Sequence, residues 1–466
     1  MRKIIQVQDK VPLSQWIPLS LQHLFAMFGA SILVPILFGI DPGIVLIMNG
    51  VGTLLFILFT KGKAPAFLGS SFAFLSPTFA VLAMAMKNGI VRPEPGGYDQ
   101  AFAYAQGGYI AVGVVGMIIA VIIWKFGTNW IKVVMPPAAM GPVVALIGLE
   151  LAGTAAKNAG LLPVNLNPLF DAIAKGDTTL QLSSVITPIS GANVWVFLIT
   201  LAVAVFGSVC LRKFFAVIPI LLAIVAGYIA AICFGLADFT KLSAAPWVAL
   251  PHVQLPMFDI GSIIAIIPAI LVLTTEHIGH QIVTSEVVGR DLIKDPGLHR
   301  SMLADYVSTT ISGLVGAVPT TTYGENIGVM AVTKVYSVRV IGGAAVISMV
   351  IAFIGKFTAF INTIPWAVIG GVSILLYGMI AASGIRVMVD SKVDFSKSRN
   401  LVLTAVIFVI GLSGISIDLF GVPITGMILA ALVGMLLSLV FYILDKLKLT
   451  NDREEEAAID KRTADK

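Results

Sequence analysis

The sequence is poor in charged residues. Asp, Glu, Lys and Arg together make up 12% of its 466 residues, whereas hydrophobic residues make up 58%. A soluble protein of this length balances its apolar residues with a charged surface, so the composition excludes a soluble enzyme or binding domain. The sequence therefore predicts a polytopic membrane protein embedded in a lipid bilayer.

Cysteine is nearly absent. Cys210 and Cys233 lie far apart without His or Asp neighbours, so they indicate no disulfide framework, metal site or redox pair. No Cys, Ser or His/Asp grouping has the spacing of a catalytic site, and we expect neither an enzyme nor a bound cofactor. The net charge is +5 at pH 7, but Lys and Arg are scattered between apolar segments, which argues against nucleic-acid binding.

Long apolar runs dominate the rest of the chain. A membrane-spanning helix needs about 20 mostly apolar residues, and this criterion predicts fourteen spans. Two of them, near 65–86 and 320–335, contain Gly, Ser and Pro residues that interrupt a helix, so both are predicted to be broken. The fourteen spans lie near 14–37, 43–60, 65–86, 107–126, 136–155, 193–211, 215–236, 258–283, 300–317, 320–335, 338–354, 363–384, 400–420 and 423–444.

Lys and Arg are distributed unequally between the two sides of these spans. With both termini in the cytoplasm, all but six of the 30 Lys and Arg residues lie on the cytoplasmic side, as the positive-inside rule requires. No cleavage site follows the polar start of the chain, so we expect the first span to be retained. The charged end, 446–466, is predicted to be a cytoplasmic tail that is disordered at 451–466, and the loop 156–192 to be solvent-exposed.

Two weak internal matches indicate a repeat. Gly141-Pro-Val-Val-Ala-Leu-Ile-Gly148 resembles Gly371-Val-Ser-Ile-Leu-Leu-Tyr-Gly378, and Leu21-Gln-His23 resembles Thr275-Glu-His277. Together they predict two copies of seven spans, which have opposite orientations in the membrane because seven is odd. The broken spans are the third of each copy. Inverted repeats with broken helices at matching positions are typical of secondary transporters whose site lies near the membrane midplane.

Three acids, Glu150, Glu276 and Glu325, lie inside apolar spans. A charged side chain at the centre of a spanning helix costs about 2.5–3.5 kcal/mol on insertion scales, so each is a candidate functional residue. Glu276 and His280 are four residues apart and share one helix face, whereas His277 is rotated by about 100°. Glu150 has no polar neighbour in its own helix, which makes it the weakest of the three candidates.

The second broken span favours a particular ligand chemistry. Glu325 follows Tyr323-Gly324, where the chain can present free N–H groups and begin a half-helix with its positive end toward the site. Carboxylates accept hydrogen bonds and these N–H groups donate, so the pair suits a small planar ligand with alternating N–H and C=O groups. Phe72, in the other broken span, could stack on such a ligand, with Phe74 and Tyr323 as rivals.

The remaining candidates have less specific interpretations. His280 is a natural proton carrier, because the imidazole pKa lies closest to physiological pH. His23 and His277 are more typical of structural hydrogen bonds. Tyr377, beside Gly378 in the twelfth span, is either a contact to the site or an anchor at the membrane interface.

Several of these stretches resemble the nucleobase–ascorbate transporter family. Glu325-Asn-Ile-Gly-Val-Met-Ala-Val-Thr-Lys334 fits the family signature, including Asn326, Gly328 and Thr333, and Gln22-His23 fits its first-span motif. The resemblance extends over nearly the whole chain. Further similar stretches run over 17–30, 68–74, 295–302 and 321–328.

The resemblance implies an architecture and an activity. It implies a core domain (13–126 and 258–356), a gate domain (127–257 and 357–445), and short antiparallel strands in the third and tenth spans. The implied activity is uptake of uracil with protons across a bacterial cytoplasmic membrane, and the implied assembly is a homodimer formed through the gate domains. A xanthine or uric acid symporter of the same family is the alternative, and a channel and a membrane enzyme are the alternatives from other classes.

The resemblance also implies roles for single residues. Glu276 and Glu325 would hydrogen-bond uracil, and the backbones of Phe72 and Tyr323-Gly324 would help. His280 together with Glu276 would couple protons, and Tyr377 would contact the site from the gate. Glu rather than Gln at position 325 favours a pyrimidine over a purine. The chain departs from its relatives at Thr320, where they carry Asn, and this leaves one polar contact near the site open.

Overall fold

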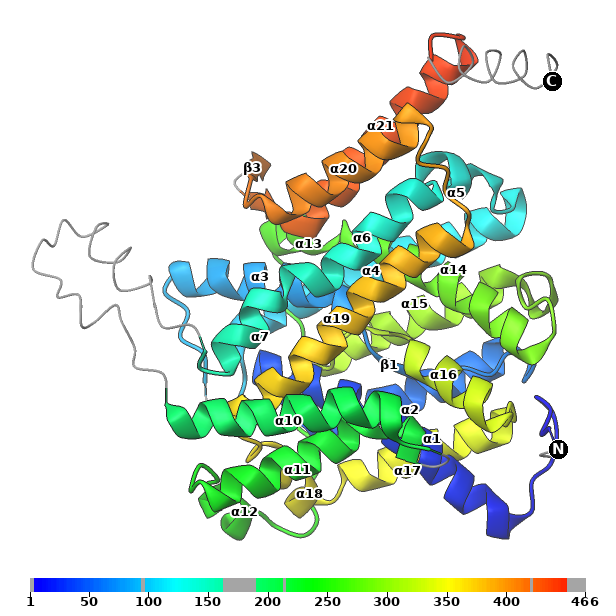
Figure 1. Ribbon diagram of the computed structural model, residues 1–466. Helices are drawn as coiled ribbons and strands as arrows, with labels where there is room; N and C mark the ends of the chain where they lie inside the picture. Colours follow the sequence, from blue (N-terminus) through cyan, green and yellow to red (C-terminus); the bar gives the residue numbers. More distant parts are fainter. Residues whose placement is uncertain (1–3, 94–96, 162–189, 213–214, 420–421, 451–466) are drawn as a thin grey trace, which may run out of the picture.

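The computed structural model of the protein is mostly helical (Figure 1). It describes residues 4–93, 97–161, 190–212, 215–419 and 422–450. The tail predicted at 451–466 and most of the loop 156–192 lie outside the described residues.

Eight helical segments within these ranges are long and apolar enough to cross a membrane. Each coincides with a predicted span, so the prediction of a multi-pass membrane protein agrees with the structure. The segments are α1 (Leu13–Phe38), α2 (Pro42–Phe59), α4 (Gln100–Phe126), α6 and α7 (Pro137–Glu150 and Ala152–Asn158), α10 (Gly191–Cys210), α13 and α14 (Ile260–Ile266 and Ala269–Val288), α19 (Trp366–Asp390) and α21 (Gly426–Lys446).

The other predicted spans coincide with helices that are shorter or more polar. The apolar ones are α3 (Leu75–Lys87), α11 (Pro219–Cys233), α17 (Val338–Ala352) and α20 (Ser398–Leu412). The two polar ones are α15 (Leu298–Val315), which buries several hydroxyl groups and one acid, and α16 (Gly324–Thr333). Short connecting helices are α5 (Asn129–Val134), α12 (Thr240–Ala244), α18 (Gly355–Ile361), η2 (Phe215–Val217) and η3 (Ile293–Gly297).

Local sequence explains where several helices begin and end. The side chain of Asp41 accepts a hydrogen bond from Gly43 N at 2.8 Å and begins α2, while Asp99 accepts one from Phe102 N at 3.1 Å and begins α4. Both are N-cap bonds, which satisfy N–H groups that have no partner within the helix. α1 ends at Gly39, whose φ of 67° is accessible to glycine at little cost.

Both predicted broken spans are broken in the structure. β1 (Leu68–Ser70) pairs antiparallel with β2 (Thr320–Thr322), with Leu68 opposite Thr322 and Ser70 opposite Thr320. Every residue of the two strands is buried. The first strand leads through the 3-10 turn η1 (Phe72–Phe74) into α3, and the second leads into α16. The strand pair therefore lies in the protein interior. The half-helices α3 and α16 both start at the point where the two strands cross.

The predicted spans at 400–420 and 423–444 were wrong where the first ends and the second begins. α20 stops at Leu412, and Gly414 has a φ of 72°. The next residues form a second strand pair, in which β3 (Ser416–Leu419) runs antiparallel to β4 (Val422–Thr425). The glycine ends the helix, and Ile415 and Ile417 then favour extended structure, which an apolar-window criterion cannot distinguish from a helix.

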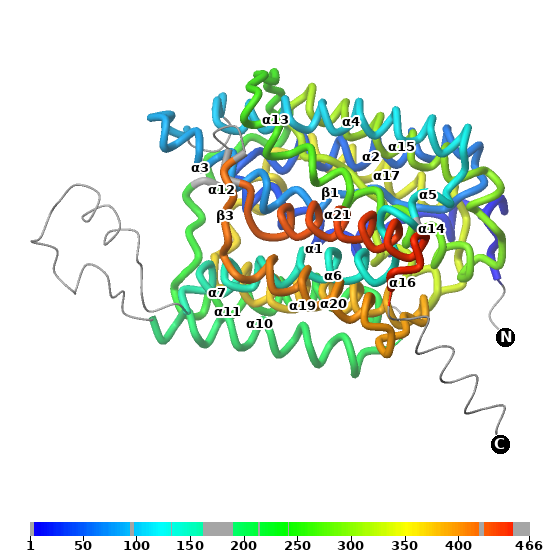
Figure 2. The backbone as a smooth tube through the Cα atoms, turned by 90° about the horizontal axis from the view of Figure 1, so that it is seen from above, coloured from blue at the N-terminus to red at the C-terminus, as the bar shows by residue number. Residues whose placement is uncertain are grey.

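The helices pack in two groups, which Figure 2 shows from above. α2 and α4 pack against α15 and α17 on one side, and α6 and α10 pack against α19 and α20 on the other. Glycines permit the closest approaches: a Cβ at Gly116 of α4 would overlap the ring of Tyr306 in α15, and a Cβ at Gly148 of α6 would overlap the carbonyl of Tyr377 in α19.

An extended segment, 246–257, connects the two groups and runs along the first. Its Gln254 N donates to Val315 O at 3.3 Å and its Met257 N donates to Ala103 O at 2.9 Å. The Gln254 side chain donates to Gln106 Oε1 at 2.5 Å. The segment is thus attached to α4 and the end of α15 at the side where α13 begins.

Candidate functional site

The crossing strands form the frame of the candidate site. Ser71 N donates to Pro319 O at 2.8 Å and Tyr323 N donates to Phe67 O at 3.1 Å, which extends the pairing at both ends of the strands. α16 starts directly after this junction. The first N–H groups of a helix have no acceptor within it, so the start of α16 offers donors at the crossing point.

The three candidate aromatic residues point in different directions. The Tyr323 ring lies over Gly69, where a Cβ would overlap it, and its hydroxyl donates to Ser70 O at 3.1 Å. Phe74 packs edge-on against Tyr109 and is fully buried. Phe72 instead faces Tyr377 of α19, with ring centroids 6.4 Å apart and planes at 79°. Tyr323 therefore braces the strand pair, and Phe72 is the aromatic residue that meets the opposite helix group.

Glu276 and His280 lie on α14, on the face that the sequence pattern gave them. Glu276 Oε2 is buried and has no hydrogen-bond partner among the described residues. His280 Nδ1 lies 3.1 Å from Thr322 Oγ1, at the end of β2. A Cβ at Gly324 would lie 3.3 Å from His280 Nε2, so the imidazole sits against the start of α16.

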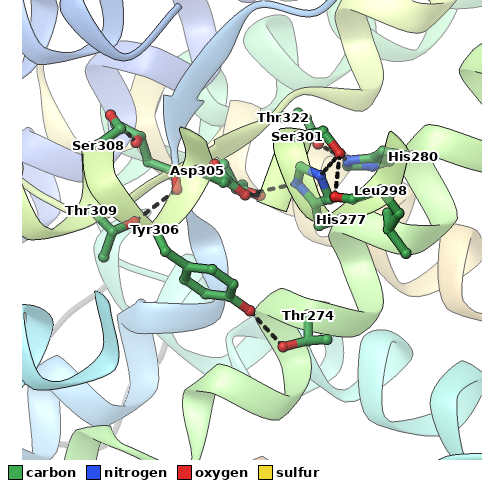
Figure 3. Close-up of polar contacts among 12 residues, drawn as sticks. Thr274, His277, His280, Leu298, Ser301, Asp305, Tyr306, Ser308, Thr309 and Thr322 are labelled. Atoms are coloured by element: carbon green, nitrogen blue, oxygen red, sulfur yellow. Dashed lines mark hydrogen bonds and ion pairs between the residues drawn. The ribbon is translucent and has the colours of Figure 1, made fainter. Parts of the chain in front are cut away.

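His277 points away from this face and enters a buried polar network (Figure 3). Its Nδ1 lies 2.9 Å from Asp305 Oδ2, and its Nε2 lies 2.9 Å from Ser301 Oγ. Thr321 Oγ1 donates to the same Asp305 oxygen at 3.3 Å. Asp305 is 1% exposed, and its Oδ1 has no hydrogen-bond partner in the part of the chain that the structure describes.

Asp305 is the acid that the sequence analysis did not select. The available signal was a stripe at helical spacing in α15, where Ser301, Asp305, Ser308 and Ser312 lie on one face of a span that should be apolar. Thr320 belongs to the same region, since its hydroxyl donates to Ser308 Oγ at 2.7 Å. At position 320, where the chain differs from its relatives, the threonine hydroxyl therefore forms a hydrogen bond in the protein interior.

Glu325 lies in the first turn of α16, where a carboxylate is favoured by the helix dipole. α14, which carries Glu276, packs against both α16 and α15, so Glu276 lies on a helix that contacts the two helices carrying Glu325 and Asp305. No Lys or Arg of the described chain forms an ion pair with any of the three acids. The structure thus brings the helices that carry the three acids together beside the strand crossing, and two of the acids have a buried oxygen without a partner among the described residues.

The signature residues support α16 from outside this centre. Asn326 Nδ2 lies 2.9 Å from His23 Nδ1, which joins α16 to α1. Thr333 Oγ1 donates to Val329 O at 2.7 Å in the last turn. Gln22 is buried, whereas a Cβ at Gly328 would meet nothing within 4 Å among the described atoms. Close packing in this conformation therefore does not explain a glycine at position 328.

Tyr377 approaches from the second helix group. Its ring is 1% exposed, and its hydroxyl has no hydrogen-bond partner within the described residues. No group of three or more His, Cys, Asp and Glu side chains among the described residues is arranged to hold a metal ion. The arrangement offers hydrogen-bond acceptors, helix-start donors and an aromatic face, which is chemistry for binding and proton exchange.

Comparison with known proteins places the chain among membrane carriers. A family model described as "Permease family" matches residues 14–419. The uracil permease of Escherichia coli K12 is 48% identical over 464 residues, covering 100% of this chain and 99% of the relative. The uracil permeases of Bacillus caldolyticus and Bacillus subtilis are 45% and 43% identical, and cover 94% and 93% of this chain.

Solved structures match in fold at low sequence identity. The transmembrane domain of the cyanobacterial bicarbonate transporter BicA has a TM-score of 0.64 at 15% identity, over 93% of this chain and 100% of that chain. SLC26A9 has a TM-score of 0.66 at 13% identity, over 93% of this chain and 66% of that chain. At such identities the match concerns the fold alone.

Proposed function

Because the chain belongs to the Permease family and is a transporter rather than an enzyme, we propose that it imports uracil together with protons by alternating access. The observation that carries the proposal is that α14, which carries Glu276, packs against α16, whose first turn carries Glu325. The two carboxyl groups can accept from the uracil N–H groups, while helix-start N–H groups can donate to its carbonyls. The relatives that carry the name uracil permease support the substrate.

Proton coupling is supported by the charge of the site. Glu276, Glu325 and Asp305 lie on three helices that pack together, where an unpaired charge is costly, and the imidazoles of His277 and His280 lie in the same region. Uptake of a proton by this cluster would lower the charge that moves with the substrate. Glu276 and His280 are the proposed coupling residues, and they can titrate as a pair because they lie one helical turn apart.

The core and gate domains remain a proposal with the boundaries given by the sequence. The proposed core (13–126 and 258–356) contains the strand pair and α14, and the proposed gate (127–257 and 357–445) contains Tyr377. The two helix groups of Figure 2 support this division, apart from the connecting segment 246–257, which runs along the core. In this scheme the core carries uracil past the gate.

Fourteen spans in two inverted repeats are supported by how the helices pair. In two repeats of seven spans, span two (α2) corresponds to span nine (α15), and span four (α4) corresponds to span eleven (α17). The contact of α2 with α17 accordingly has its counterpart in the contact of α15 with α4. Likewise the contact of α10 with α19 corresponds to that of α20 with α6. A repeated unit that is inverted in the membrane requires such paired contacts.

Location and assembly follow from the same proposal. We place the protein in the cytoplasmic membrane of a bacterium because its relatives are bacterial permeases. The Lys and Arg distribution supports a cytoplasmic position for both termini. A homodimer through the gate domains is the proposed assembly. Cross-linking of the purified protein in lipid nanodiscs tests it, and an exclusively monomeric species would contradict it.

The decisive experiment is accumulation of labelled uracil in proteoliposomes that are acidic outside and neutral inside. We expect uptake above the equilibrium level, and we expect a protonophore to abolish the excess. If uracil merely equilibrates whatever the gradient, a channel or uniporter replaces the symporter. If xanthine or uric acid enters and uracil neither enters nor competes, the alternative substrate class is correct.

A further inference from the structure

Glu150 lies where three elements meet. It is the last residue of α6, and its Oε1 accepts a hydrogen bond from Ser76 Oγ of α3 at 2.7 Å. Its Oε2 accepts a hydrogen bond from Met427 N at the start of α21 at 3.2 Å. Both oxygens are therefore engaged, by partners that are remote in sequence.

The backbone at the start of α21 forms the binding position of the Glu150 carboxylate. The start of α21 offers N–H groups without acceptors inside the helix, and the helix dipole favours a negative charge there. Gly426 precedes Met427 with a φ of 55°, and a Cβ at Gly426 would overlap the Glu150 carboxylate. A glycine at this position gives the carboxylate room to sit on the helix start.

Ser76 connects the Glu150 carboxylate to the region where the two strands cross. It is the second residue of α3, four residues after Phe72, so it lies about one helical turn from the ring that faces Tyr377. Ser76 belongs to the proposed core, whereas Glu150 and Met427 belong to the proposed gate. Outside the connecting segments 240–257 and 355–361, the bond from Ser76 to Glu150 is the only side-chain hydrogen bond between core and gate among the described residues.

We propose that Glu150 is a positioning residue that fastens the gate to the core in this conformation. The inference rests on the proposed transport function. Movement of the core past the gate has to break the bond from Ser76, while the bond to Met427 N stays within the gate and keeps the carboxylate in place. The strength of this contact then sets how readily the conformation is left, although Glu150 itself does not touch uracil.

The first test compares two hydroxyl deletions on one helix. Ser76→Ala removes the bond between core and gate, whereas Thr78→Val removes a bond to Tyr109 that lies wholly within the core. We expect Ser76→Ala to raise the rate of uracil exchange in proteoliposomes by up to about tenfold, since hydrogen bonds to charged groups are among the stronger ones. Uracil affinity in detergent should change less than about twofold.

Every other result overturns the inference. A rate at or below that of the parent protein would mean that the bond does not restrain movement. An equal rise in Thr78→Val, or a loss of uracil affinity in Ser76→Ala, would mean that the hydroxyl acts only through the structure of α3. If the parent protein neither binds nor carries uracil, the proposed function fails first, and that outcome is distinct from a failure confined to Ser76→Ala.

A second test locks the contact covalently. Ser76→Cys and Glu150→Cys are combined with Cys210→Ala and Cys233→Ala, because both native cysteines are exposed. Oxidation should cross-link the pair, stop transport and leave uracil binding intact, and reduction should restore transport. The same protein before oxidation is the control. Continued transport by the cross-linked protein, or failure of the pair to cross-link, would overturn the proposal.

Discussion

The two broken segments share a backbone plan but differ in chemistry. In each, a three-residue buried strand leads into a half-helix, and the strands pair with one another. The first segment contributes Phe72 and otherwise mostly apolar side chains, whereas the second contributes Glu325 and Asn326. A symmetric backbone can therefore present an apolar surface from one side of a site and polar groups from the other.

The two segments also depend on each other. The Tyr323 ring of the second fills the space that Gly69 leaves in the first, and its hydroxyl bonds Ser70 O of the first. The polar segment thus braces the apolar one, and changes on the two sides are expected to have different consequences. Substitutions on the two sides can therefore separate recognition, bracing and proton coupling.

Removing an acid from the polar side should abolish recognition. We expect Glu325→Gln and Glu276→Gln each to weaken uracil binding by about 10-fold to 100-fold, because each replaces a charged hydrogen-bond acceptor of the site with a neutral amide. Isothermal titration of the purified variants measures this. Glu286→Gln is the matched control, since Glu286 is an exposed residue of the same helix as Glu276. Undiminished binding by Glu325→Gln would remove that residue from the site.

Filling the glycine on the apolar side should damage the frame. Gly69→Ala places a Cβ in the Tyr323 ring, and we expect a loss of about 1–3 kcal/mol in stability, as for other overpacked sites. Gly328→Ala, in the signature, meets no described atom within 4 Å and should cause no comparable loss. Thermal unfolding of both variants in detergent tests the contrast, and equal melting temperatures would disprove the bracing.

Substitutions of the two histidines of α14 should have different effects, one on proton coupling and the other on stability. We expect His280→Gln to retain uracil binding and exchange but to lose accumulation driven by a proton gradient. We expect His277→Gln to lower stability by about 1–3 kcal/mol, because it removes the imidazole from the buried Asp305 and leaves the longer bond from Thr321. Accumulation by His280→Gln at the parental level would exclude it as a coupling residue.

The smallest change tests the brace alone. Tyr323→Phe removes only the hydroxyl that donates to Ser70 O, so we expect a stability loss of about 0.5–1.5 kcal/mol with uracil binding retained. Thermal unfolding and titration measure both quantities. A large loss of binding would instead mean that the hydroxyl contacts the substrate.

The parts of the fold that depend on apolar composition and on the spacing of helix-breaking residues could be predicted from the sequence. Apolar length located the spans, and the Gly, Ser and Pro residues near 65–86 and 320–335 located the two breaks. The hairpin of β3 and β4 was missed, because Ile415 and Ile417 are as apolar as a spanning helix and only Gly414 marks the change.

The candidate site was predictable only in part. The face shared by Glu276 and His280 follows from helical periodicity, which is a local property. The partners of Asp305 and of Glu150 could not be derived, since they come from other helices and depend on how those helices pack. The orientation of Tyr323 depends likewise on the strand pair, which joins segments far apart in the chain.

The strand pair also has a consequence for biosynthesis. Leu68 is added to the nascent chain long before its partner Thr322. At about 5–20 residues per second, the ribosome needs on the order of ten seconds or more to cover that interval. During this time the first strand stands in the membrane without the acceptors and donors that later satisfy its backbone. The insertion machinery or an early neighbouring helix has to shelter it, and a fragment that ends before Thr322 leaves it exposed.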